Sequence, residues 1–156
     1  MTSSLCRSLY IILFSLFCMQ ICACSLWQSQ VHLNAVTIDT VPDANDNAPV
    51  AVDIVAIADA SLVPTIQALS AAQWFNARSQ LLRDAPGGLR VWSLELVPGS
   101  RFVAEDNPLR GAPAEALVLF ARYRSEGDHR LRLDKRDSLH LLLMTDEAVI
   151  ASAQGK

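Results

Sequence analysis

The four cysteines are the side chains of this sequence with the widest range of chemistry, because a thiolate can attack an electrophile or bind a metal and a thiol can pair in a disulfide. All of them lie at or before position 24: Cys6, Cys18, Cys22 and Cys24. Residues 25–156 contain no cysteine, so we expect neither a disulfide framework nor a cysteine-based metal site in the folded part of the chain. The remaining possibility is that one of these N-terminal cysteines acts as a nucleophile.

The residues around Cys24 have the order of a bacterial lipoprotein signal. Arg7 gives a positive start and residues 8–20 form an apolar stretch, as in a secretory signal peptide, and this stretch is marginal for a membrane-spanning helix. The segment Ile21-Cys22-Ala23-Cys24 then resembles a lipobox, in which the thiol of the last cysteine accepts a diacylglycerol. Cys22 is a poorer acceptor because Ile21 would precede it. Cleaved secretion without a lipid and an uncleaved anchor are the alternatives.

The lipobox divides the chain into four parts. We expect a signal peptide over residues 1–23, an acylated Cys24 with a tether over residues 24–30, a folded domain over residues 31–150 and a frayed tail over residues 151–156. Several acyl chains on one residue anchor a protein stably, where a single chain is marginal. Ser25 stands where an aspartate would mark inner-membrane retention, so the resemblance implies the periplasmic face of the outer membrane.

Patterns that indicate an enzyme or a nucleic-acid binder are absent from the sequence. His32, His129 and His140 stand at no metal-binding spacing, and there is no GxSxG, P-loop or GxGxxG motif. The net charge of −3 lacks the basic excess of a nucleic-acid-binding protein. We therefore expect no catalytic residue, no cofactor, no small-molecule substrate and no nucleic-acid partner.

One polar segment superficially resembles a calcium loop. Residues 43–47 (DANDN) place side-chain oxygens at alternating positions, but Ala48 replaces the turn glycine and Ile54 replaces the bidentate glutamate. We therefore expect a polar turn and no metal site.

Charged residues are distributed unevenly. Residues 25–77 contain no lysine or arginine, and their aspartates either steer a basic partner or only keep the protein soluble; these are Asp39, Asp43, Asp46, Asp53 and Asp59. Four arginines alternate with apolar residues on neighbouring predicted strands, which indicates the solvated face of a half-buried sheet, with partner or lipid contact as the alternative; these are Arg122, Arg124, Arg130 and Arg132.

Hydrophobic periodicity predicts six or seven strands and two short helices between the second and third strands. Strands are expected over residues 31–39, 50–58, 89–97, 101–104, 117–124, 129–134 and 139–145. Ser70 and Gln73 form a capping box at the start of the second helix, which Pro86-Gly87-Gly88 ends at about Asp84. Antiparallel strands at this spacing suggest a mainly β fold, a two-sheet sandwich, with the helices covering one end or edge of a sheet.

The order of these features resembles the outer-membrane lipoprotein family of type VI secretion systems, the J subunit. The residues that carry the resemblance are the loop and strand at 45–54 (NDNAPVAVDI), the aromatic helix piece at 72–75 (AQWF), the turn at 96–99 (LVPG) and the strand at 117–123 (LVLFARY). Two departures are the absence of a tyrosine from Ala56-Ile57-Ala58 and a longer helical insert. The resemblance implies a transthyretin-like two-sheet β-sandwich with a short helical insert.

The resemblance also implies a structural role and a partner. Such a subunit is fixed to the outer membrane by its acylated cysteine, here Cys24, and binds the periplasmic domain of the large inner-membrane subunit through the loop after its first strand. Mapped onto this sequence, the partner-binding loop is Thr40–Pro49, and the contacts fall on Pro42, Asp43, Asn45, Asp46 and Asn47. An accessory or pilotin-like periplasmic lipoprotein of another envelope machine is the alternative, and an enzyme or small-ligand binder is a third.

Overall fold

The structure is a computed structural model of the chain, and it describes residues 29–133 and 136–151. The expected signal peptide, Cys24 and nearly all of the tether lie outside the described residues, as does the tail from residue 152. In chain order, the elements are β1 (Ala35–Thr40), η2 (Ala44–Asn47), β2 (Val50–Ile57), η3 (Ala60–Leu62), α2 (Val63–Ala68), α3 (Ala71–Asp84), β3 (Leu89–Leu96), β4 (Arg101–Ala104), β5 (Ala116–Arg122), β6 (Arg130–Arg132), β7 (Ser138–Leu143) and β8 (Ala148–Ile150).

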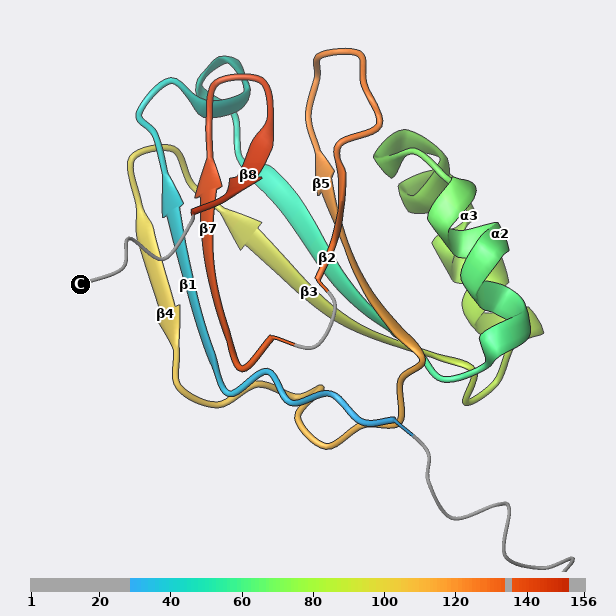
Figure 1. Cartoon of the computed structure of the whole chain (residues 1–156). Coiled ribbons are helices and arrows are strands. Elements are labelled where there is room, and N and C mark those ends of the chain that lie inside the picture. Colours follow the sequence, from blue (N-terminus) through green and yellow to red (C-terminus); the bar gives the residue numbers. More distant parts are fainter. Residues whose placement is uncertain (1–28, 134–135, 152–156) are drawn as a thin grey trace, which may run out of the picture.

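The strands form two four-stranded sheets that pack face to face (Figure 1). One sheet has the order β4-β1-β7-β8, and the other has the order β3-β2-β5-β6. The helices α2 and α3 lie in the chain between β2 and β3. The mainly β two-sheet sandwich with a helical insert is therefore confirmed.

Two details of the strand prediction are wrong. β1 and β7 pair in parallel, with Val36 opposite Leu139, although an antiparallel arrangement was expected. No tight turn joins these two distant segments, so hairpin geometry does not fix their relative direction. The structure also has an eighth strand, β8, which covers only Ala148–Ile150 and is too short to show a periodic pattern.

The space between the sheets is filled by alternate side chains of the paired strands. Fully buried residues from both sheets meet there, including Val36, Ile38, Val52, Ile54, Leu119, Leu141 and Leu143. Val31 and Leu33 join this core although they precede β1, because hydrogen bonds such as Val31 N to Ala112 O, at 2.9 Å, hold the segment in place. The first strand is therefore shorter than its apolar pattern predicts.

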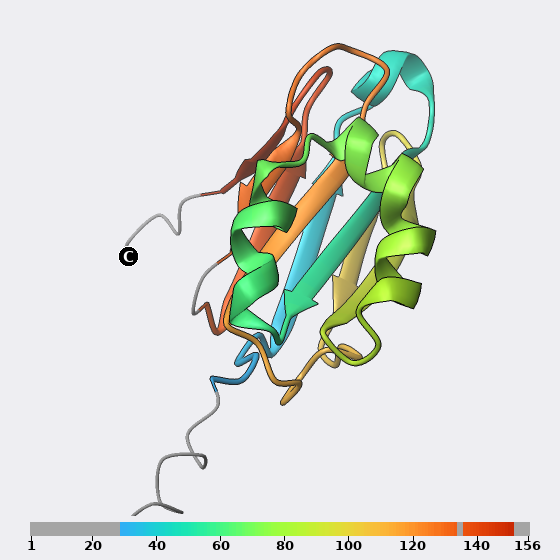
Figure 2. The ribbon, with the colours of Figure 1, turned by 90° about the vertical axis from the view of Figure 1, so that its right-hand side faces the viewer.

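The helices cover the outer face of the β3-β2-β5-β6 sheet (Figure 2). The expectation that they cover an end or edge is wrong, because β2 and β5 carry apolar residues on both faces and need a second layer. Val55, Val118 and Phe120 point into this layer, where the Trp74 ring stacks on Phe120 at 5.0 Å between centroids. Ser70 and Gln73 form the predicted capping box of α3.

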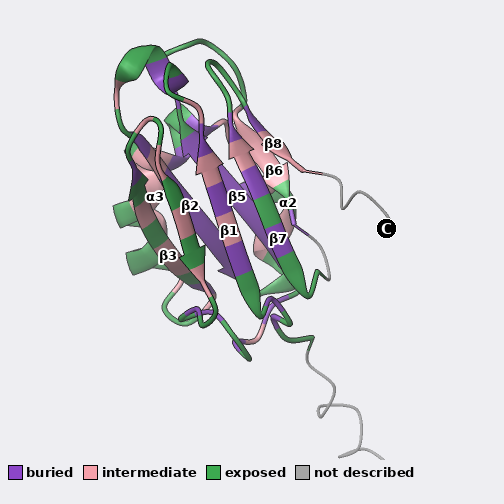
Figure 3. Cartoon of the chain, turned by 90° about the vertical axis from the view of Figure 1, so that its left-hand side faces the viewer, coloured by how far each residue is buried: buried purple, intermediate pink, exposed green. Residues whose placement is uncertain are grey.

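The outer face of the other sheet has no helix over it (Figure 3). Along β1 and β7, buried residues alternate with residues that are exposed or half-buried. Within the described residues, no helix is long and apolar enough to cross a membrane.

Candidate functional site

The two ends of the sandwich differ in what they carry. Four connections gather at one end, which we call the loop end; they are residues 41–49, 97–100, 123–129 and 144–147 (Figure 1). Hydrogen bonds join them, including Asn45 N to Thr145 O at 2.8 Å and Ser125 Oγ to Asp146 O at 3.2 Å. The described chain begins at the opposite end, which we call the entry end, where Ala114 N donates to Ser29 O at 2.8 Å.

The loop between β1 and β2 contains an uncommon backbone conformation. Three consecutive residues have positive φ angles: Asn45 at 50°, Asp46 at 54° and Asn47 at 57°. Asparagine and aspartate tolerate this left-handed region better than other residues with a side chain. The polar composition of this segment therefore supports a single left-handed turn, which is the expected polar turn in a specific form.

Asn45 holds this turn in place from inside. Asn45 is buried, with only 5% of the residue exposed. The amide nitrogen Nδ2 donates to Pro49 O at 3.0 Å, and the amide oxygen Oδ1 accepts from the backbone nitrogen of Arg124 at 2.7 Å. Asn45 thus ties the β1–β2 loop to the start of the β5–β6 connection, and its side-chain amide makes hydrogen bonds inside the protein.

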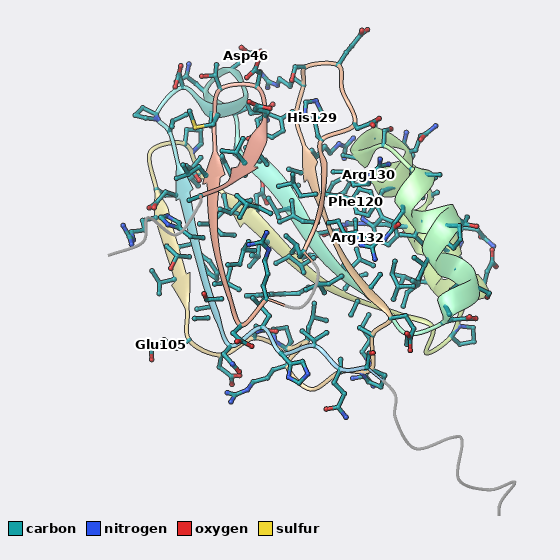
Figure 4. The ribbon with its side chains drawn as sticks, viewed as in Figure 1. Asp46, Glu105, Phe120, His129, Arg130 and Arg132 are labelled. Atoms are coloured by element: carbon teal, nitrogen blue, oxygen red, sulfur yellow. The ribbon has the colours of Figure 1, made fainter. Side chains whose placement is uncertain are left out.

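The other four residues of the predicted partner-binding loop are exposed: Pro42, Asp43, Asp46 and Asn47. Asp43 accepts a hydrogen bond from Thr145 Oγ1 at 3.0 Å, so it is linked to the β7–β8 turn. Asp46 lies at the tip of the loop end (Figure 4). The structure therefore divides the five predicted residues into one internal support and four surface positions.

The β7–β8 turn also belongs to the loop end, which the sequence reasoning missed. Asp146 and Glu147 are exposed in this turn. The hydroxyl of Tyr123 donates to Glu147 O at 2.8 Å, and burial, followed by the nearby Asp146 and Glu147 carboxylates, raises the pKa of Tyr123. The short polar segment after the apolar strand at 139–145 is the sequence signal that would have located it.

The three histidines lie apart. His129 is at the loop end (Figure 4), where its Nε2 lies 2.9 Å from Ser125 O. His140 lies on the uncovered sheet face, with Nε2 2.7 Å from Asp39 Oδ2, and His32 lines a hollow at the entry end. In the part of the chain that the structure describes, no group of three or more His, Cys, Asp or Glu side chains is placed to hold a metal.

Three of the four alternating arginines, Arg122, Arg130 and Arg132, lie beside α2 and α3, the helices that form the helix layer over the β3-β2-β5-β6 sheet. The register pairs Phe120 with Arg130 and Val118 with Arg132, so both arginines face the helices. Arg130 donates to Leu69 O at 2.8 Å, at the C-terminal end of α2. Arg122 lies over the Phe75 ring, 5.7 Å from its centroid. These side chains therefore help to fasten the helices to the sheet.

A hollow lies at the entry end. Its volume is about 490 Å³, and Val31, Leu33, Leu117 and Arg132 are among the residues that line it. It lies beside the segment that leads from the N-terminal part of the chain. It is therefore separated from the loop end by the length of the strands.

Comparisons with known proteins show which solved structures share this fold. No protein-family model and no curated protein matches the sequence. Among solved structures, a chain of the "Type VI membrane complex" matches with a TM-score of 0.60 and 15% identity, over 76% of this chain and 96% of that chain. The type VI secretion lipoprotein TssJ1 from Pseudomonas aeruginosa matches with a TM-score of 0.50 and 15% identity, over 78% of this chain and 96% of that one.

A third match carries the name of another protein of the same system. A chain of the structure described as T6SS protein TssM C-terminal domain (869–1107) from EAEC has a TM-score of 0.58 and 14% identity, over 76% of this chain and 97% of that one. The resemblance to the type VI lipoprotein is confirmed as a structural match to TssJ over most of the chain.

Proposed function

We propose that this protein is the outer-membrane lipoprotein subunit of a type VI secretion membrane complex, and that its loop end binds the periplasmic domain of the large inner-membrane subunit. The observation that carries the proposal is a TssJ-like sandwich, which follows a segment at residues 21–24 that resembles a lipobox. In this role the protein acts by binding and positioning, and it needs neither a catalytic residue nor a cofactor.

The opposition of the two ends supports this role. Four residues lie between Cys24 and Ser29, so five residue steps would place the lipid within about 18 Å of the entry end even with the chain fully extended. Strands of six to eight residues span about 20 to 26 Å, which is the distance between the entry end and the loop end. An anchored domain of this shape presents its loops away from the lipid, toward a partner in the periplasm.

The β1–β2 loop is also suited to binding because it is already ordered. Asn45 fixes the left-handed turn through its side chain, and Asp43 is fixed by Thr145. A loop held in one conformation loses little entropy when a partner binds. Pro42, Asp43, Asp46 and Asn47 are therefore the proposed contacts, and Asn45 is the proposed support.

The binding test compares one acidic residue at each end. The full chain, purified from membranes in mild detergent, is titrated with the periplasmic domain of the inner-membrane subunit. We expect micromolar or tighter binding, weakened about tenfold by Asp46→Lys, because an exposed interfacial carboxylate is reversed in sign. Glu105→Lys is the matched control, since Glu105 is an exposed acid at the entry end (Figure 4).

The outcome distinguishes a type VI membrane-complex subunit from an accessory lipoprotein of another envelope machine. Absence of binding by a folded wild-type chain would overturn the proposal and would direct unbiased periplasmic crosslinking toward another envelope machine. Equal weakening by both variants would show that general charge, rather than the β1–β2 loop, governs the encounter.

The anchor has a separate test. Cells that express the chain are labelled with radioactive palmitate, and the labelled protein is followed through inner- and outer-membrane fractions. We expect label in the wild type and in Cys22→Ser, and none in Cys24→Ser. Label that persists in Cys24→Ser, or wild-type label confined to the inner membrane, contradicts the proposed anchor.

A further inference from the structure

Two exposed apolar side chains, Val97 and Met144, lie on connections of the loop end. Among the described residues, the large apolar side chains with the greatest exposure are Leu82 at 37%, Val97 at 59%, Val103 at 58% and Met144 at 37%. Single exposed apolar residues are ordinary, but neighbouring ones mark interaction surfaces. The connection that carries Val97 follows β3, and the connection that carries Met144 follows β7.

Backbone contacts bring these residues together from three separate connections. Gly99 N donates to Val41 O at 3.1 Å, and a Cβ built on Gly99 would stand 3.8 Å from the Cα of Pro42. The turn that carries Val97 therefore lies directly against Pro42. On the other side of Val41, its backbone nitrogen donates to Leu143 O at 3.0 Å. Met144 follows Leu143 directly, so it begins the connection on that side. We call Pro42, Val97 and Met144 the apolar corner.

The apolar corner is held by short-range hydrogen bonds. Ser100 closes the Val97 turn, with its backbone nitrogen 3.1 Å from Val97 O and its hydroxyl also donating to that oxygen. Gly99 has a φ angle of 73°, which a residue with a side chain adopts only with strain. The exposed Val97 thus sits on a tight turn of fixed geometry, so its burial by a partner would cost little ordering of the backbone.

Acidic side chains flank the apolar corner. Asp43 follows Pro42 in the chain, and Asp146 and Glu147 follow Met144 by two and three positions; all three are exposed. Asp46, Glu126 and Asp128 add exposed carboxylates in the same connections, against the exposed Arg124 and the half-buried His129. A surface that complements this end must therefore be basic.

We propose that the apolar corner is a second part of the partner-binding surface, beside the β1–β2 loop. It receives an apolar side chain of the partner protein that is surrounded by lysine or arginine side chains. This inference rests on the proposed function, because its occupant is the periplasmic domain of the inner-membrane subunit. It adds Val97 and Met144, on two further connections, to the predicted contacts.

The test uses two valines of nearly equal exposure. Val97→Ser and Val103→Ser make the same chemical change at 59% and 58% exposure, but Val103 lies on β4, outside the loop end. The full chain in mild detergent is titrated with the periplasmic domain at low and moderate salt. We expect Val97→Ser to weaken binding about fivefold or more, since an apolar side chain loses its burial, and Val103→Ser to leave binding unchanged.

Met144→Gln provides a second variant on an independent connection, with a smaller expected weakening of about threefold or more, because Met144 is less exposed. Binding of all variants at wild-type strength overturns the apolar corner but leaves the proposed function standing. Wild-type binding that does not weaken with salt overturns the basic character of the partner surface. A wild-type chain that does not bind at all removes both proposals. Thermal unfolding within a few degrees of wild type confirms that each variant is folded.

Discussion

Two carboxylates of the same residue type show how differently the helix layer and the loop end use polar groups. Asp53, in the middle of β2, is 1% exposed and accepts hydrogen bonds from Trp74 Nε1 at 2.8 Å and Arg78 Nη1 at 2.9 Å. Asp46, at the tip of the β1–β2 loop, is exposed. A buried polar group must be paired within the protein, whereas an exposed one is free to meet a partner.

The contrast extends to the residues around each carboxylate. The helix layer surrounds Asp53 with stacked rings and apolar strands, so its polar groups stabilise the fold. At the loop end, Asp46 lies in a backbone turn that the side chain of Asn45 holds through hydrogen bonds to Pro49 and Arg124. The molecule therefore separates stability and recognition between two regions, and substitutions in each region should affect mainly one of these properties.

The largest effect is expected for Phe120→Ala in the helix layer. Phe120 is fully buried and its ring stacks on Trp74 with an interplanar angle of 8°. Removal of a buried aromatic ring costs about 4 kcal/mol, because apolar burial is lost and a cavity remains. Urea unfolding should show this loss of stability, and binding to the partner should be unchanged wherever the variant is folded. A loss below about 2 kcal/mol would mean either that the helices move inward to fill the cavity or that their packing on the sheet contributes little to stability.

The next effect tests the buried polar network. Asp53→Ala leaves Trp74 Nε1 without its acceptor and removes the partner of Arg78, whose side chain is 39% exposed. We expect a loss of about 3 kcal/mol, since a broken buried pair is costly but Arg78 can turn to solvent. Chemical denaturation measures it, and the double variant Asp53→Ala with Arg78→Ala should cost less than the sum of the two single losses. Additivity of the two losses would show that the groups are not coupled.

These regions also differ in how well the sequence predicts them. The capping box, the strand expected at residues 50–58 and the helix that ends at Asp84 follow from local spacing, and the structure confirms them. The parallel pairing of β1 with β7 does not follow, because it depends on where two distant segments meet. The position of the helices over a face of the sheet also depends on tertiary packing. The apolar residues on both faces of β2 are consistent with that position.

The site follows the same rule. The polar turn at residues 43–47 is readable from its composition, but the inward direction of Asn45 is set by Arg124, which lies 79 positions away in the chain. The proximity of Val97 to Pro42 likewise arises from the contact between two turns that are distant in the sequence. Sequence reasoning therefore finds the loop, and only the fold shows which of its residues support it and which other connections lie beside it.

Asn45→Ala lies between the two regions, because Asn45 is buried but belongs to the loop end. The substitution removes the hydrogen bonds to Pro49 and Arg124, and it places alanine at a φ angle of 50°. We expect a loss of about 2 kcal/mol from these two causes, together with weaker partner binding because the turn is no longer held. Asn45→Gly keeps the backbone preference and should lose less stability. Unchanged affinity in a folded Asn45→Ala chain would contradict its role as the support of the binding loop.

The smallest stability effect is expected at Asp46, and it separates backbone from side chain. Glycine accepts the φ angle of 54° without strain, so Asp46→Gly should change the free energy of unfolding by less than about 0.5 kcal/mol, the strain relief offsetting the greater freedom of the unfolded chain. Asp46→Ala, in contrast, should cost about 1 kcal/mol because alanine disfavours the left-handed region. Denaturation compares the stabilities, and titration with the periplasmic domain compares the affinities. If the carboxylate itself makes the contact, both variants weaken binding by a similar factor despite their different stabilities; if only the backbone shape matters, Asp46→Gly binds like the wild type.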